Sequence, residues 1–172
     1  QAGLVFSEVV TGRTTGRQVI AVARGLRDGN GAFLGIVYGI LELDYLQTLF
    51  RFVDLGPQGS IALRRSDNNA LVVRHPELPM EVNRPASDDN PMANAMAGGQ
   101  QTATIRFVSR VDGIDRIFSA HSLSYYPLRF VVGISLADAL AVRLCLWLLN
   151  GMLRQESRGR LERQLGRLRQ MR

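Results

Sequence analysis

The chain has 172 residues, of which 46% are hydrophobic and 21% charged, and this composition is typical of a globular protein with a buried core. The formal net charge of +6 comes largely from arginines between Arg154 and Arg172, so a basic nucleic-acid-binding face on the body of the chain is not expected. The single cysteine, Cys145, excludes an intramolecular disulfide.

The first elements in chain order predict a β-hairpin. Residues 18–24 are rich in β-branched side chains, residues 27–31 form a dense turn signal, and residues 32–43 predict a second strand. The preceding residues 12–17 superficially resemble a phosphate-binding loop. They lack the lysine and the following helix that such a loop needs, so we interpret them as a surface turn rather than an anion site.

A short helix is expected to begin at Asp44 and to end before the turn at residues 56–59. The Asp44 carboxylate is placed to cap the first turn, and Gln47 completes a capping-box pattern. Helical spacing predicts one apolar face, consisting of Leu46, Leu49, Phe50 and Val53.

The middle of the chain predicts five antiparallel strands. Alternation and turn signals place them at residues 60–65, 70–74, 102–111, 115–125 and 128–135. The long polar connection between the second and third strands is expected to contain a single helical turn at residues 92–96. A hairpin, a long connection and a three-stranded meander together predict an α+β fold, and the first hairpin needs a sheet of its own.

The chain is expected to be helical from residue 137 to its end. The apolar stretch 139–153 is shorter than the roughly 20 residues of a membrane span, although the arginines after it would suit a cytoplasmic flank. The alternative, which we favour, is a helix that pairs with another helix. Its apolar stripe would be Leu161, Leu165 and Leu168.

No set of residues points to catalysis or to a metal. His75 and His121 are the only histidines and have no partners at metal-ligand spacing. Asp67, Asp88 and Asp89 fit solvated turns better than a calcium loop. No nucleophile elbow or Ser/His/Asp set is present. The chain is therefore predicted not to be an enzyme and to need no cofactor.

Polar side chains on or beside the predicted strands are candidates for ligand binding. An arginine beside an aromatic ring in a concave sheet suits a small carboxylate, through a bidentate pair. Alternation separates Ser119 and His121 from Phe118 and Ala120, without deciding which face is inward. The candidate ligand-binding residues are Arg74, Arg106, Ser119, His121 and Tyr125; for each, the alternative is a solvent-exposed side chain.

Five stretches occur in the order found in one known family. They are GRTTGRQVIAVAR at 12–24, DGNGAFLGIVYGILELDYL at 28–46, DLGPQGSIALRRSDNNALVVRHP at 54–76, DGIDRI at 112–117 and YYPLRFVVGISL at 125–136. On these stretches the chain resembles the double Cache (PAS-like, PDC) extracytoplasmic sensor domains of bacterial diguanylate cyclases and histidine kinases.

The resemblance implies a PAS-like five-stranded antiparallel sheet, a remnant of a second Cache module and a long C-terminal helix. Residues 1–43 would be the C-terminal part of a membrane-distal module, 44–56 a connecting helix, 57–136 the membrane-proximal module and 137–172 a helix leading toward the membrane. The missing first helix and strands of the family are typical of a fragment or a processed chain.

The function implied by the resemblance is periplasmic sensing by part of an inner-membrane protein. The domain would bind a small molecule such as a carboxylate, form a homodimer through helices, and signal through its C-terminal helix to a diguanylate cyclase or histidine kinase. Amino-acid-binding members place an aspartate where this chain has Gly39 or Ile40, so amino-acid recognition by that route is not expected.

Two other classes of function remain open at this point. One is a secreted or periplasmic protein–protein interaction module that dimerises through its basic tail without a ligand. The other is an arginine-rich nucleic-acid binder, whose affinity would fall steeply with salt because phosphate contacts release counterions. No nucleic-acid partner is expected in the interpretation we favour.

Overall fold

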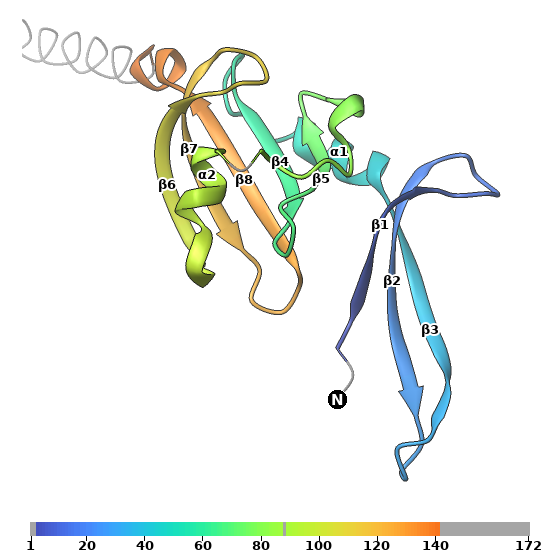
Figure 1. Cartoon of the computed structure of the whole chain (residues 1–172). Helices are drawn as coiled ribbons and strands as arrows, with labels where there is room; N and C mark the ends of the chain where they lie inside the picture. Colours follow the sequence, from blue (N-terminus) through green and yellow to red (C-terminus); the bar gives the residue numbers. More distant parts are fainter. Residues whose placement is uncertain (1–2, 88, 142–172) are drawn as a thin grey trace, which may run out of the picture. The chain divides into compact units, whose positions relative to one another are not determined.

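The computed structural model describes residues 3–87 and 89–141 (Figure 1). Its N-terminal sheet has three antiparallel strands, β1 (Val5–Thr11), β2 (Gln18–Arg27) and β3 (Phe33–Glu42), in that order. The predicted hairpin is β2 and β3, while β1 was not predicted. Residues 12–17 form the turn between β1 and β2, which is closed by a 2.8 Å hydrogen bond from the Gly12 amide to the Arg17 carbonyl.

Helix α1 (Leu43–Arg51) follows β3 without a linker. The predicted capping box of Asp44 and Gln47 is wrong, because the N-cap position is Glu42, whose side chain makes no capping hydrogen bond. Glu42 pairs with Val19 as the last residue of β3, so the chain stays extended through Glu42 and Asp44 falls inside the first helical turn. Leu43 and Phe50 are the buried residues of the helix.

The predicted five-stranded antiparallel sheet is confirmed, and with the three-stranded sheet it makes an α+β fold. Its strand order is β5-β4-β8-β7-β6, with β4 and β8 adjacent in the interior. The strands are β4 (Ser60–Arg65), β5 (Leu71–His75), β6 (Thr102–Val108), β7 (Asp115–Ser122) and β8 (Leu128–Ser135).

The connection between β5 and β6 contains short helical segments. Two are 3-10 turns, Pro79–Glu81 and Ala97–Gly99, and the third is α2 (Pro91–Ala95), which confirms the predicted helical turn. Asn90 caps α2 by accepting hydrogen bonds from the Met92 and Ala93 amides, and Pro91 suits the first helical position because it has no amide hydrogen to leave unpaired.

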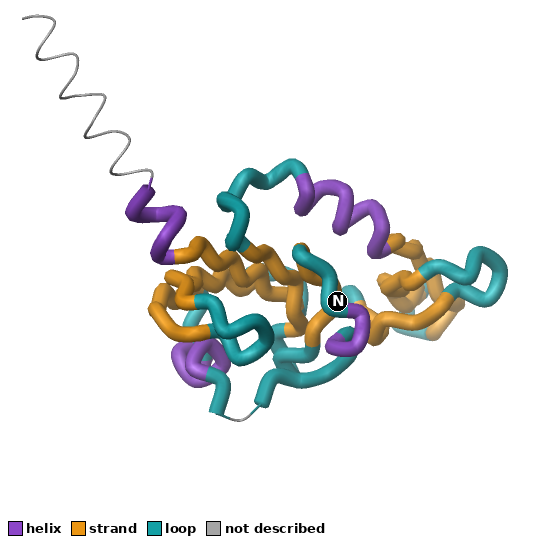
Figure 2. The backbone as a smooth tube through the Cα atoms, turned by 90° about the horizontal axis from the view of Figure 1, so that it is seen from above, coloured by secondary structure: helices purple, strands orange, loops and turns teal. Residues whose placement is uncertain are grey.

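Helices α1 and α2 lie on opposite faces of the five-stranded sheet (Figure 2). On one face, Ile61 and Leu63 pack in a core with Phe50 of α1. On the other face, Phe118 and Ala120 pack with two methionines of the β5–β6 connection, Met92 and Met96. The face of β7 that the sequence left open is thereby decided, since Phe118 and Ala120 point inward.

The three-stranded sheet is attached to the larger sheet through its first two strands. Val9 and Ile20 belong to the same apolar core as Ile61. The Asn83 side chain accepts from the Val9 amide at 2.9 Å and donates to the Val9 carbonyl at 2.7 Å. Strand β3, by contrast, exposes apolar side chains on both faces. They are Phe33, Leu34, Ile36, Val37, Tyr38 and Ile40.

Residues 136–141 are helical and begin a second unit of the chain, residues 136–172. The rest of the predicted long C-terminal helix lies outside the described residues. The leucine stripe and nearly all of the apolar stretch 139–153 lie outside them as well. Among the described residues, no helix has the length and apolar character needed to cross a membrane.

Candidate ligand-binding site

A cavity of about 710 Å³ lies on the face of the five-stranded sheet that carries α2. Strand side chains line one side of it, and the connection between β5 and β6 lines the other. Small residues leave room above the sheet, since Ala62 pairs with Val131, which in turn pairs with Ala120. The volume is within the range of pockets that enclose a small molecule.

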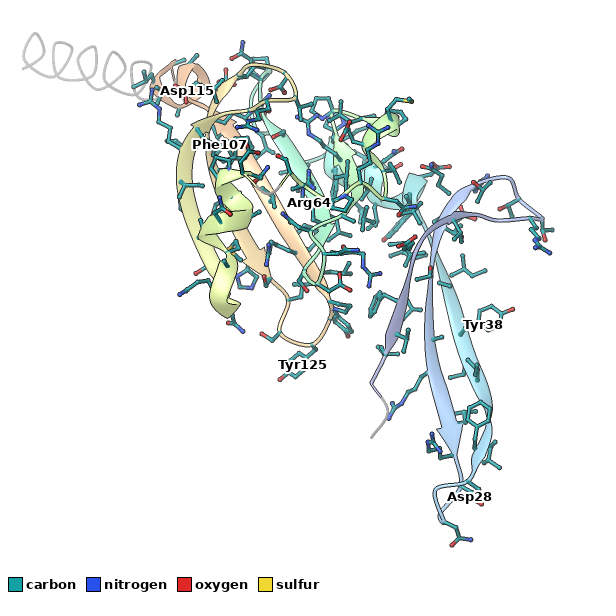
Figure 3. The ribbon with its side chains drawn as sticks, in the orientation of Figure 1. Asp28, Tyr38, Arg64, Phe107, Asp115 and Tyr125 are labelled. Atoms are coloured by element: carbon teal, nitrogen blue, oxygen red, sulfur yellow. The ribbon has the colours of Figure 1, made fainter. Side chains whose placement is uncertain are left out.

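Arg64 of β4 lines this cavity without a counter-ion. Its Nη1 donates a 2.8 Å hydrogen bond to the Asn69 carbonyl, and no carboxylate among the described residues pairs with it. Burial lowers the pKa of the Arg64 guanidinium and the positive charge of Arg74 lowers it further, while the negative charge of Glu81, which forms no ion pair with Arg64, acts in the opposite direction. A cation held partly away from water without a partner is costly, and an anion in the cavity would offset that cost. Figure 3 shows Arg64 on β4.

Arg74 of β5 lines the same cavity and is 10% exposed. It donates to the Pro76 carbonyl at 2.9 Å and to Asp112 at 3.1 Å. Asp112 also accepts a 2.8 Å hydrogen bond from Arg116, whose side chain is 2% exposed. Burial acts to raise the pKa of Asp112, but hydrogen bonds from Arg116 and Ser109 hold it well below its usual range. One carboxylate thus serves two guanidinium groups.

The remaining charged groups of the cavity lie at its exposed rim. Arg84 pairs with Glu81 at 3.4 Å, and Arg110 pairs with Asp89 at 2.5 Å, with all four side chains well exposed. Exposed pairs of this kind contribute little to stability, so we assign them no structural role.

The apolar end of the cavity is aromatic. Phe107 of β6 and Phe118 of β7 are stacked, with ring centroids 4.3 Å apart and planes inclined by 23°. Both line the cavity. The cavity therefore combines a cationic group with an aromatic surface.

Of the five residues predicted to bind a ligand, Arg74 is the one that lines the cavity. Strand alternation puts three others on the exposed face of β6 and β7, opposite Phe107 and Phe118. Tyr125 is 91% exposed and projects from the β7–β8 turn (Figure 3). The four residues that the structure does not bring together with Arg74 are Arg106, Ser119, His121 and Tyr125.

Arg64 was missed at the sequence level, although a signal for it exists. Arg64 and Arg65 are adjacent in a strand, so one of them must point to each face. Arg65 points away from the cavity and donates to the Phe6 and Ser7 carbonyls of β1. Whichever face of β4 lined a cavity, either Arg64 or Arg65 would therefore have pointed into it.

The histidines take no part in this cavity. His121 is exposed, and the Nδ1 atom of His75 is buried without a hydrogen-bond partner in the described part of the chain. Within residues 3–87 and 89–141, no cluster of three or more His, Cys, Asp or Glu side chains could hold a metal ion.

The sequence model of one protein family matches residues 43–133, which run from α1 to β8. Its description is a histidine kinase sensor domain of the dCache_1-like type. This match covers more than half of the chain and reaches all five strands of the larger sheet, ending within β8. The comparison with curated proteins found no match.

Several solved structures share the fold. The extracellular domain of rpHK1S-Z16, assigned to the histidine kinases, has a TM-score of 0.65 and 27% identity, with 81% of this chain and 56% of that chain covered. The periplasmic sensory domain of the Campylobacter jejuni chemoreceptor Tlp1 has a TM-score of 0.64 and 13% identity, covering 81% and 52%. The ligand-binding domain of the Pseudomonas aeruginosa amino-acid chemoreceptor PctB has a TM-score of 0.59 and 24% identity, covering 85% and 55%. The chain thus spans about half the length of these structures.

Proposed function

Because the chain belongs to the dCache_1-like family of histidine kinase sensor domains, we propose that it detects a small molecule in the arginine-lined cavity and relays binding through residues 137–172. The chain is a sensor domain and not itself catalytic. Its homologues are extracellular or periplasmic domains. One observation carries the proposal: a cavity large enough for a metabolite contains Arg64, which has no counter-ion among the described residues.

The relatives support a small-molecule ligand. PctB of Pseudomonas aeruginosa was solved with L-Arg bound. For this chain we propose a carboxylate-bearing ligand, held by Arg64 together with Arg74. Arg106, Ser119, His121 and Tyr125 are left out of the proposed site, because they lie away from the cavity.

We propose the following organisation. Residues 1–43 are the C-terminal part of a membrane-distal Cache module, 44–56 connect the modules, 57–136 are the PAS-like membrane-proximal module, and 137–172 lead to the membrane. The apolar side chains exposed on both faces of β3 support the assignment of residues 1–43 to a separate module. An apolar face of a sheet is normally covered by another layer of structure, and no such layer covers either face of β3 among the described residues.

We propose that the sensor domain is the periplasmic part of an inner-membrane protein and that its output is membrane-linked. The family description favours a histidine kinase and gives no support to a diguanylate cyclase. The alternative remains an interaction module without a ligand, and finding a ligand for the cavity would decide against it.

We also propose a homodimer through residues 139–172. The predicted stripe of Leu161, Leu165 and Leu168 would be buried between two helices, because apolar residues at this spacing form one seam. Sedimentation of the chain with and without residues 139–172 tests this. The expected result is a dimer that becomes a monomer on truncation, and a monomer in both cases would contradict it.

The test of the proposed function is a thermal-shift screen of the full chain against organic acids, amino acids, amines and neutral metabolites. A bound ligand raises the melting temperature by mass action. Ala62→Leu fills the cavity floor and is expected to abolish the shift. Thr104→Leu, on the exposed face of β6, is the matched control and is expected to keep it. A ligand that stabilises both variants equally would show that sensing takes place elsewhere.

A further inference from the structure

The charges around the cavity are almost fully paired. Four arginines line it, and three of them have a carboxylate partner. These pairs are Arg74–Asp112, Arg84–Glu81 and Arg110–Asp89. Arg64 is the exception within the described residues. The cavity therefore offers one lining cation without a carboxylate, which a single negative charge would match. The second charge of a dianion would leave water without meeting another arginine that lacks a carboxylate partner.

The cationic end and the aromatic end of the cavity are well separated along the sheet. Ser60 pairs with Gly133, and Gly133 pairs with Phe118, so Phe118 lies in the same row as Ser60. Arg64 is four residues further along β4, which corresponds to about 13 Å between backbone positions. A ligand that contacts both ends must have an elongated shape.

Between the two ends, the cavity floor on β4 and β8 consists of short apolar side chains. Ala62 and Val131 form the row between Arg64 and Ser60 and line the cavity. Arg74, next to Ala62 on β5, lies at the edge of this row and is paired with Asp112. Neither the Ala62 nor the Val131 side chain can hydrogen-bond, so a polar ligand body lying there would lose its contacts with water. An apolar body would instead gain by leaving water.

We infer that the ligand is a monocarboxylic acid with an aromatic or branched apolar body, held at its carboxylate by Arg64 and at its body by Phe107 and Phe118. This inference rests on the proposed function and narrows its ligand class. Arg64 commits one N–H to the Asn69 carbonyl, so its other donors can form the two parallel hydrogen bonds that a carboxylate accepts.

The experiment compares matched probes on the full chain by thermal shift and titration calorimetry. 3-Phenylpropionate and 5-methylhexanoate supply one carboxylate and an elongated apolar body, aromatic in the first and branched in the second. 3-Phenylpropionamide keeps the first body without the charge, and succinate supplies two charges without the body. Both acids are expected to bind, and the amide and succinate are expected to bind at least about tenfold more weakly, the ratio that one charge-assisted hydrogen bond supports.

Variants of Arg64 separate a ligand-binding role from a structural one. Arg64→Met keeps most of the side-chain stem and removes the charge. The ligand-free variant is expected to melt at the same or a higher temperature, because the substitution removes a half-buried cation that has no ion-pair partner among the described residues. Its affinity for 3-phenylpropionate is expected to fall at least about tenfold. Arg64→Lys should retain part of the affinity, since it keeps the charge but loses the planar fork.

Arg106→Met is the matched control outside the cavity. It removes an exposed arginine of β6 that pairs with Asp115, so its effect on affinity is expected to stay below about fivefold. A lower melting temperature with unchanged affinity in Arg64→Met would make Arg64 structural and overturn the inference. The amide or succinate binding as tightly as the acids would overturn it too, while leaving the proposed function intact. If no compound of any class shifts the melting temperature, the proposed function fails and the inference with it.

Discussion

Replacing Asp112 by Asn is expected to lower the free energy of unfolding by about 3 kcal/mol. Arg116 is 1% exposed and donates to the Asp112 carboxylate at 2.8 Å and to the Gln58 carbonyl at 2.6 Å. The substitution leaves that buried guanidinium without its charge partner. We place the loss at the lower end of the range for a broken buried pair, because 27% of the Asp112 side chain is exposed. Urea unfolding at pH 7 measures it.

Asp115→Asn is the matched control in the same hairpin. Asp115 pairs with Arg106 at 2.6 Å, but that arginine side chain is 58% exposed. Exposed ion pairs contribute about 0–1 kcal/mol, so this variant should unfold nearly as the parent does. An equal decrease in the free energy of unfolding in the two variants would show that the Asp112–Arg116 pair stabilises the fold no more than an exposed ion pair does.

The stability difference between the parent and Asp112→Asn is also expected to depend on pH. Hydrogen bonds from Arg116 and Ser109, working against burial, lower the folded-state pKa of Asp112 below its unfolded value of about 4. A lowered pKa stabilises the fold above the unfolded value, and that contribution is lost as the pH falls through the folded-state value. The difference between the parent and Asp112→Asn should therefore be constant above about pH 5 and shrink below about pH 4. A difference that grew on acidification would contradict the assignment.

Replacing Gly133 by Ala is expected to cost about 1–3 kcal/mol of stability and to weaken ligand binding. A Cβ atom at this buried position of β8 would lie 2.5 and 2.7 Å from two ring carbons of Phe118 and 3.0 Å from Cδ of Arg116. Arg116 is buried and held by hydrogen bonds, so the Phe118 ring must move. Because that ring lines the cavity, its displacement should change both the unfolding midpoint and the affinity.

Gly39→Ala is the matched control for the glycine substitution. Gly39 lies in β3, where an added Cβ would meet nothing within 4 Å. A glycine replaced without strain leaves stability unchanged or slightly higher, because the unfolded chain loses freedom. Chemical unfolding and calorimetry of both variants test the pair, and an unchanged Gly133→Ala protein would show that the sheet adapts at β8 without cost.

Local sequence signals determined most of the strands of this protein. The alternation and turns from Ser60 to Ser135 predicted all five strands of the larger sheet, with β4 and β8 at their observed bounds. These signals are local because side chains alternate with a period of two along each strand, and turn-forming residues separate one strand from the next. The start of α1 was one residue off, since pairing of Glu42 with the distant Val19 decides where the extended chain ends.

Only the tertiary structure decided which residues make the candidate site. Ser119 and Phe118 are neighbours in sequence, and alternation separates them without saying which side is covered. The covering comes from Met92 and Met96, more than 20 residues away on the β5–β6 connection, so Phe118 enters the cavity and Ser119 stays exposed. By the same logic Arg64 lines the cavity and Arg106 does not. Burial depends on contacts between distant segments, and those contacts set the charge environment in which an arginine can bind an anion.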